Sequence, residues 1–563
     1  MSAGTISERP DVDAAPADND GARSAVPARL LARLPPPVRA RSAFALVVAV
    51  GAVARIVGLR WGLPQQLHAD EWVVVQGALT MAERHSFEPP YFFRPDHLEM
   101  EASNIAYLVY SGLIGARSVQ SAYFADPAAF LLISRSITAA FGVGMILLAY
   151  AIGRRFTLGT GLVAAALVAV FPPFVEHSYY ATPDVPLTFC LMVVVLGCMR
   201  YLESQAPRDL LVACAGLALA VSVKYPGAIG GLIIAAVLVM EAIRTRDWKR
   251  LVRHAGIAAV AVPGFLFLIS PVLFTDASSV MEAFASESRD FHLGADGLGW
   301  GGNLAFYATT YAGAAGLTLV LAAAIGAYWC VRRRQRLAIP LLLGVVYWVA
   351  LSSLALHWER WALPMYIAPL LLAAIGIRET LHHLRSARAP RWQLAVLGTV
   401  VGVAAVNLVT ATAAIAAMHV LPDTRLRAAA DFRELGIDET NTISEGYTPL
   451  LPARAASIFD RVQVQGGELV TLPGANQARF VVVSSAMYDR YIAEERYSAE
   501  REVYRLLDET YPRVTTYEPL PRDATTSVEP VNIVRSVSYV VRAVGGGYGG
   551  PTLKVYEVGP AQR

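Results

Sequence analysis

The chain has 563 residues, of which 55% are hydrophobic and 17% are charged. This composition is too apolar for a soluble multidomain protein and indicates many membrane spans. The formal net charge is only +3, because arginine-rich loops are balanced by acidic ones, and nucleic acid is therefore not expected as a partner. All four cysteines fall in apolar segments, which predicts neither a disulfide framework nor a metal site; they are Cys190, Cys198, Cys214 and Cys330.

The N-terminal residues differ sharply in composition from the rest of the chain. Residues 1–41 are rich in Ala, Pro, Arg and Asp and contain no apolar run, so we expect a disordered leader on the cytoplasmic side. Eleven apolar segments come after it within 42–418, most of them near the roughly 20 residues that cross a bilayer. They are expected near 42–61, 128–152, 159–176, 184–202, 208–223, 226–243, 254–274, 305–331, 337–356, 361–377 and 393–418. The sequence therefore predicts an α-helical polytopic membrane domain.

Lysine and arginine gather in alternate connections between these segments. With a cytoplasmic N-terminus, the cytoplasmic connections include Arg244–Arg253, Arg332–Arg336 and Arg378–Arg391. The opposite connections carry few basic residues, which matches the positive-inside rule. We therefore expect a multi-pass protein of the cell membrane whose residues 419–563 lie outside the cytoplasm.

Two of the outer loops are long. The first, 62–127, has apolar residues at helical spacing in Asp70–Arg84 and in Asn104–Val119, which predicts two helices along the membrane interface. The other, Thr275–Asn303, ends in the glycine-rich stretch Leu293–Gly302, which we expect to be flexible.

Residues 419–563 are polar and predict a small soluble α/β or α+β domain. Helices are expected at Arg425–Leu435 and Ala499–Glu509. Strands are expected at Phe480–Ser484, Val537–Ala543 and Leu553–Val558.

The tetrapeptide His68-Ala69-Asp70-Glu71 follows the first apolar segment directly. Two adjacent carboxylates suit a general base beside a second, orienting carboxylate. A simpler alternative is an acidic pair in the first turn of a helix. His68 is either an interface histidine or a substrate contact.

A short outer turn supplies the next acidic candidates. Asp184 stands at the head of the fourth span, where it could cap the helix or act as a catalytic carboxylate. Glu176 and His177 lie in the same turn and are candidates for binding substrate.

Cations are found in other outer turns. Lys224 is a lone cation between two spans; it could snorkel to the interface or hold a phosphate. Arg360 lies in His357-Trp-Glu-Arg-Trp361, and its guanidinium could grip a phosphate bidentately. Further candidates are Arg94, for phosphate, and His97 and His357, for substrate.

The pair Asp70-Glu71, Asp184 in Tyr180-Ala-Thr-Pro-Asp184 and the many spans resemble the GT-C glycosyltransferases of the family 39 type. That group includes protein O-mannosyltransferases and the lipid A aminoarabinose transferase, and the resemblance covers about 42–380. It implies transfer of a hexosyl or pentosyl group from a polyprenyl-phosphate donor to a hydroxyl of a lipid, glycan or protein acceptor, with inversion.

The resemblance also implies roles for individual residues. Asp70, Glu71 and Asp184 would be catalytic, while Lys224 and Arg360 would bind the donor phosphate. The first outer loop departs from the family, because it has no lysine and no Tyr-Pro-Pro or Lys-Pro-Pro element. Arg94 would replace that cation.

The sequence leaves open whether the protein needs a metal ion and whether it is an enzyme or a transporter. Some GT-C enzymes need a metal, and carboxylate oxygens would suit Mg²⁺ or Mn²⁺. The alternative function is that of a polytopic transporter or lipid-linked glycan flippase, which would more often place charges at mid-membrane in two related halves. Here the acids cluster in outer loops and no internal repeat is visible, which favours the enzyme.

Overall fold

The structure is a computed structural model that describes residues 36–92, 95–287, 289–449, 458–472, 478–519 and 533–559. Contacts group the chain into two units, Met1–Leu46 and Val47–Arg563. Apart from the first part of α2, every element below belongs to the second unit.

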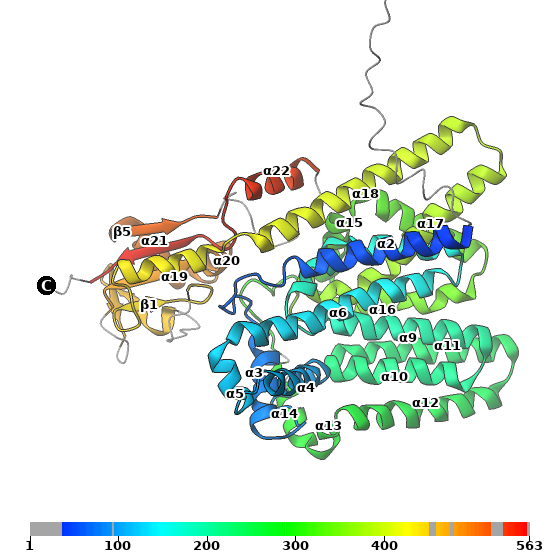
Figure 1. Cartoon of the computed structure of the whole chain (residues 1–563), viewed down its shortest axis with the longest axis horizontal. Helices are drawn as coiled ribbons and strands as arrows, with labels where there is room; N and C mark the ends of the chain where they lie inside the picture. Colours follow the sequence, from blue (N-terminus) through cyan, green and yellow to red (C-terminus); the bar gives the residue numbers. More distant parts are fainter. Residues whose placement is uncertain are drawn as a thin grey trace, which may run out of the picture. The chain divides into compact units, whose positions relative to one another are not determined.

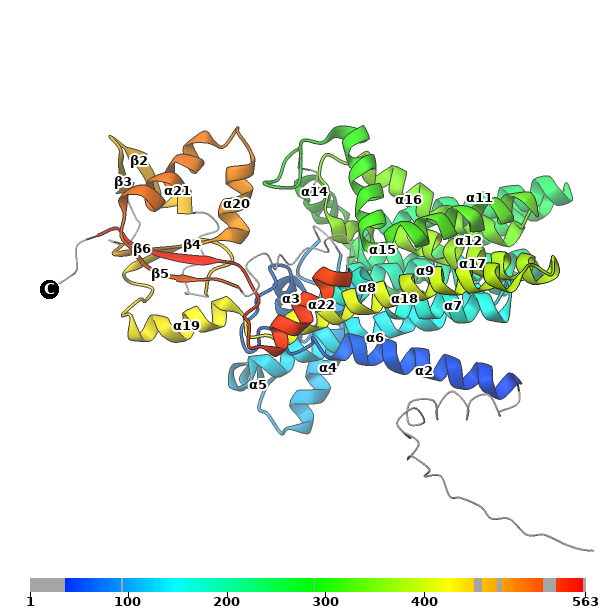
Figure 2. The same cartoon turned by 90° about the horizontal axis from the view of Figure 1, so that it is seen from above.

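Each expected span corresponds to a helix or to a pair of consecutive helices (Figures 1 and 2). Among the residues that the structure describes, seven helices are long and apolar enough to cross a membrane, or eight if the bent pair α7–α8 counts as one span. The helical membrane fold is thus confirmed, while the count of eleven spans stays a prediction. The helices are α2 Pro36–Ile56, α6 Pro127–Gly153, α7 Leu158–Ala169, α8 Pro172–Glu176, η1 His177–Tyr179, α9 Asp184–Ser204, α10 Pro207–Val223, η2 Tyr225–Ile229, α11 Gly230–Thr245, α12 Trp248–Ile269, α15 Gly299–Arg332, η3 Arg336–Leu341, α16 Leu342–Ser352, η4 Glu359–Tyr366, α17 Ile367–Ser386 and α18 Arg391–Val420.

The first helix begins earlier than expected. α2 starts at Pro36, so residues 36–41 are helical and do not belong to the predicted leader. Proline suits the first turn of a helix, where its missing N–H leaves no hydrogen bond unmade. The rest of that prediction, residues 1–35, lies outside the described residues.

Residues 62–127, which were expected to form the first outer loop, contain three helices that pack on the bundle: α3 Glu71–Glu83, α4 His97–Leu113 and α5 Val119–Ala125. One face of α3 is buried against Tyr107 of α4 and Phe130 of α6. The expected helix Asn104–Val119 has the wrong bounds, because the chain turns at Gly115 with a φ of +65° before α5 begins. The loop after α12 carries α13 Val272–Thr275 and α14 Ala277–Glu287.

A four-stranded sheet, with strand order β1-β4-β6-β5, organises the C-terminal region. β1 and β4 are parallel, whereas β4–β6 and β6–β5 are antiparallel. The strand expected at Phe480–Ser484 is confirmed and is fully buried. The elements are α19 Thr424–Glu434, β1 Thr442–Ser444, η5 Ile458–Asp460, the hairpin β2 Val462–Gln465 and β3 Glu468–Thr471, β4 Phe480–Ser484, α20 Ser485–Ala493, α21 Ser498–Thr510, β5 Arg513–Tyr517, α22 Ile533–Val544 and β6 Leu553–Glu557.

The strand expected at Val537–Ala543 is wrong, because these residues belong to α22. Their β-branched side chains favour a strand. However, α22 packs along α18 (Figure 1), whereas Val537, Val541 and Val544 are exposed. Tertiary packing therefore overrides the local preference.

Candidate active site

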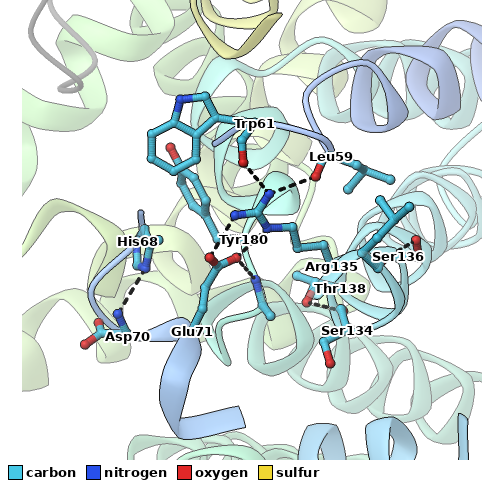
Figure 3. Close-up of polar contacts among 12 residues, drawn as sticks. Leu59, Trp61, His68, Asp70, Glu71, Ser134, Arg135, Ser136, Thr138 and Tyr180 are labelled. Atoms are coloured by element: carbon cyan, nitrogen blue, oxygen red, sulfur yellow. Dashed lines mark hydrogen bonds and ion pairs between the residues drawn. The ribbon is translucent and has the colours of Figure 1, made fainter. Parts of the chain in front are cut away.

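Glu71 and Arg135 form a fully buried ion pair at the start of α3 (Figure 3). Arg135 Nε donates to Glu71 Oε1 at 2.7 Å and Nη2 donates to Oε2 at 2.9 Å. Arg135 Nη1 also donates to the carbonyls of Leu59 and Trp61, and the backbone N–H of Ala181 donates to Glu71 Oε1 at 3.0 Å. The Glu71–Arg135 pair thus connects α3 and α6 with the segment after α2 and the turn before α9.

Asp70 points in another direction from its neighbour, as successive residues at a helix start diverge by about 100°. Its carboxylate forms an ion pair with Arg360 of η4. Both side chains stay partly exposed, Asp70 at 25% and Arg360 at 20%. The backbone N–H of Asp70 donates to His68 Nδ1 at 3.2 Å (Figure 3). The His68 ring stacks on Tyr180 with centroids 4.4 Å apart. Burial lowers the pKa of His68 to about 4, so the ring is neutral at pH 7 and can accept this bond.

Lys224 and Asp184 form a second ion pair near η4, with Lys224 Nζ 2.9 Å from Asp184 Oδ1. Asp184 lies in the first turn of α9, and Lys224 follows the last residue of α10 in an extended conformation. Lys224 Nζ also lies 5.4 Å from the ring centroid of Trp361. The ends of α9, α10 and η4 therefore converge on one cation.

The Asp70–Arg360 pair stands in a wall shared by two cavities. The first has a volume of about 520 Å³, and the second has a volume of about 600 Å³. His292 and Trp358 also line both cavities. The first is further lined by Lys224 and Arg289 and by the aromatic residues Trp72, Tyr225, Phe284 and Trp361. A carboxylate and several cations can thus act on groups that arrive from two sides.

The remaining predicted residues divide into three groups. Glu176 and His177 line the second cavity, together with His68. His97 is buried at the start of α4 beside the carbonyl of Tyr91 and lines neither cavity. His357 packs its ring on Phe306 and lines neither cavity, although its neighbours Leu356 and Trp358 do. Arg94 lies outside the described residues.

A divalent cation does not fit these carboxylates as they are arranged. Asp70, Glu71 and Asp184 each already pair with a basic side chain. Within the described ranges, no group of three or more His, Cys, Asp or Glu side chains is placed to hold a metal ion.

The stretch Leu293–Gly302, whose flexibility stays a prediction, makes several polar contacts in the structure. Asp296 Oδ1 accepts from Arg496 Nη2 at 2.6 Å, and the N–H of Gly294 donates to Glu494 Oε1 at 2.9 Å. The carbonyl of Ala295 accepts from the backbone N–H of His357 at 2.7 Å. The connection between α20 and α21 therefore fixes the loop that carries His292 into both cavities.

Sequence reasoning missed several residues of this site. Arg135 had a usable signal, because it is the only charged residue of the apolar helix α6, and ionisable groups within spans are usually paired. His292 and Trp358 carry no such signal. Only the meeting of two loops distant in the sequence brings them together.

Part of the chain is similar to a known protein family, and its fold is similar to that of a solved structure. Residues 132–274, from α6 to α13, match the family model described as dolichyl-phosphate-mannose-protein mannosyltransferase. The archaeal oligosaccharyltransferase AglB from Archaeoglobus fulgidus, solved with an inhibitory peptide and a dolichol-phosphate, is similar at 12% identity. That alignment has a TM-score of 0.50 and covers 85% of this chain and 73% of that one. The chain thus has a segment similar to this mannosyltransferase family and a fold similar to that of AglB.

Two further solved structures resemble this chain. ArnT from Cupriavidus metallidurans bound to undecaprenyl phosphate is 17% identical, with a TM-score of 0.47 over 69% of this chain and 72% of that one. The S. cerevisiae protein O-mannosyltransferase Pmt1-Pmt2 complex bound to the sugar donor is 21% identical, with a TM-score of 0.32 over 45% and 36%. No curated protein sequence matches the chain. The predicted family resemblance is confirmed, and nothing in these comparisons favours a transporter.

Proposed function

We propose that this protein transfers a sugar from a polyprenyl-phosphate donor to an acceptor hydroxyl on the extracytoplasmic side of the membrane, with inversion at the anomeric carbon. One observation carries the assignment of the site. Asp70 and Arg360 stand between two cavities, and Lys224 lines the first of them. An alcohol nucleophile needs a base, and a departing phosphate needs positive charge.

The first cavity suits the donor. Lys224 and Arg360 provide charge for a phosphate, while several aromatic side chains line the rest of the cavity. Phe284, on its rim, is 47% exposed and offers apolar surface to a lipid chain. AglB, which has a similar fold, was solved with a dolichol-phosphate, and this supports a lipid-phosphate donor here.

The reaction is a single displacement. Asp70 accepts the proton of the acceptor hydroxyl as its oxygen bonds to the anomeric carbon. The bond between that carbon and the phosphate oxygen breaks, and the electron pair leaves with the polyprenyl phosphate. Arg360 and Lys224 stabilise the charge that develops on this oxygen. No step passes through a metal ion.

Glu71 and Asp184 serve a different purpose in this proposal. Glu71 is fully buried against Arg135, and Asp184 is buried against Lys224. We assign both to positioning: Glu71 holds the segment that presents Asp70, and Asp184 holds the Lys224 ammonium at the first cavity.

The test is the Asp70→Asn variant, purified in detergent and given a radiolabelled polyprenyl-phosphate sugar with total envelope acceptors. Loss of the base should reduce transfer by about 10²–10⁴-fold. The control is Glu88→Gln, which removes a carboxylate from an exposed position of the same outer loop and should leave transfer unchanged. Full transfer by a folded Asp70→Asn protein would refute the proposal.

A further inference from the structure

The second cavity is closed on one side by the C-terminal region. Trp61, His68 and Tyr180 line it from the membrane domain, whereas Tyr447 and Asp489 line it from residues beyond α18. Its volume of about 600 Å³ lies within the roughly 300–1,000 Å³ of typical small-molecule sites. The C-terminal region thus forms part of a site-sized cavity that also contains Asp70.

The C-terminal wall of this cavity is formed where two parallel strands end. Tyr447 follows β1, and Ser485, which begins α20, follows β4. β1 and β4 are neighbours in the sheet, with Ser444 in register with Val482. Open α/β sheets bind ligands in the crevice outside the carboxyl ends of their parallel strands. The cavity therefore occupies the position where such a sheet places a ligand.

The conformation of Tyr447 adds an independent indication. Its φ is +61°, a left-handed value that a non-glycine residue adopts at some cost in energy. The Arg490 guanidinium lies over its ring, with Cζ 5.3 Å from the centroid. Such strained residues cluster at ligand-binding positions, and here the ring is fixed in place at the cavity wall.

The chemistry of the lining favours a sugar over a lipid. Aromatic side chains and groups that donate or accept hydrogen bonds line the cavity together, and aliphatic side chains are few. Pyranose rings present apolar C–H faces to aromatic rings and hydroxyls to polar groups, so they suit this lining. The aromatic side chains include Trp61, Tyr180, Tyr447 and Tyr488, and the polar ones include Asp489 and Arg490.

A peptide acceptor fits the surroundings less well. Extended peptides commonly bind by adding a strand to an exposed sheet edge. β1 is the edge strand on this side of the sheet, and all three of its residues are buried.

We infer that the C-terminal region binds the acceptor, and that this acceptor is a water-soluble glycan with one hydroxyl placed at Asp70. The inference rests on the proposed function and adds the acceptor class to it. His68 takes part in the same cavity: Nδ1 accepts the Asp70 backbone N–H, which leaves Nε2–H to donate to a glycan hydroxyl.

The experiment supplies the full-length enzyme with a radiolabelled polyprenyl-phosphate sugar and three acceptor fractions. These are oligosaccharides released from the cell envelope, envelope lipids, and serine- and threonine-containing peptides. We expect label in the oligosaccharide fraction. Tyr447→Ala should raise the KM for oligosaccharide roughly tenfold, the order expected for one stacked ring, without changing the KM for the donor.

Two further variants control for folding. Tyr447→Phe keeps the ring and should behave like the parent enzyme. Asp489→Asn changes a side chain of the same cavity without altering its size, so it tests this cavity even if Tyr447→Ala does not fold. Label found only in lipid or peptide, or an oligosaccharide KM that Tyr447→Ala and Asp489→Asn both leave unchanged, would overturn the acceptor inference while leaving the transferase intact. Label that never leaves the donor would overturn the proposed function itself.

Discussion

Replacing Glu71 by glutamine tests whether this carboxylate holds the site together or acts on substrate. The substitution keeps the size of the side chain but removes its charge. Arg135 would then lack a counter-charge in an environment where both side chains are fully buried. Glu71 also accepts from the backbone N–H of Ala181, so the start of α3 and the turn before α9 should loosen together.

The size of the effect follows from this burial. Removing one partner of a buried ion pair costs about 3–5 kcal/mol, because the remaining charge is left uncompensated. At about 2 °C per kcal/mol for a large domain, the melting temperature should fall by about 6–10 °C. Transfer should fall as well, since Asp70 is the residue next to Glu71.

Thermal unfolding followed by tryptophan fluorescence in detergent measures this change. Glu88→Gln, the same chemical change at an exposed position, should shift stability by less than about 0.5 kcal/mol. The double variant Glu71→Gln with Arg135→Met should melt above the single variant, because no unpaired charge remains. An unchanged melting temperature combined with lost transfer would refute the reasoning and make Glu71 a substrate contact.

Three further results are expected. Burial lowers the pKa of His68 from 6.5 to about 4, so its neutral ring supports the site fully above about pH 6.5 and this support is lost as the pH falls through about 4. The acid limb of the pH–rate profile for transfer should therefore lie below pH 5 and should change in His68→Gln. An acid limb centred near pH 6.5 would contradict this. Lys224→Met combined with Asp184→Asn leaves no buried charge unpaired, so this double variant should fold. Its KM for the donor in transfer assays should rise about tenfold or more. An unchanged donor KM would show that Lys224 does not bind the donor phosphate. Arg496→Gln breaks the ion pair with Asp296. Limited proteolysis should then cut the loop before α15 faster, while the melting temperature should change little. An unchanged cleavage rate would show that this ion pair does not hold the loop.

Much of the architecture could be predicted from local sequence. Apolar runs of span length are sufficient to mark helices such as α6 and α9, because only a helix satisfies its own backbone in lipid. A short run of β-branched residues was sufficient to predict the strand β4. The pattern failed at α22, whose β-branched residues favour a strand but which packs on α18 as a helix.

From the sequence by itself, apolar length and the position of basic residues predict that the acids and cations of these connecting turns lie on one face of a membrane bundle. Only the tertiary structure decided how the adjacent pair Asp70-Glu71 divides its roles. The partners of the two carboxylates come from distant helices, Arg135 and Arg360, and helical geometry turns the two side chains apart. One is buried in an ion pair, and the other stands between two cavities.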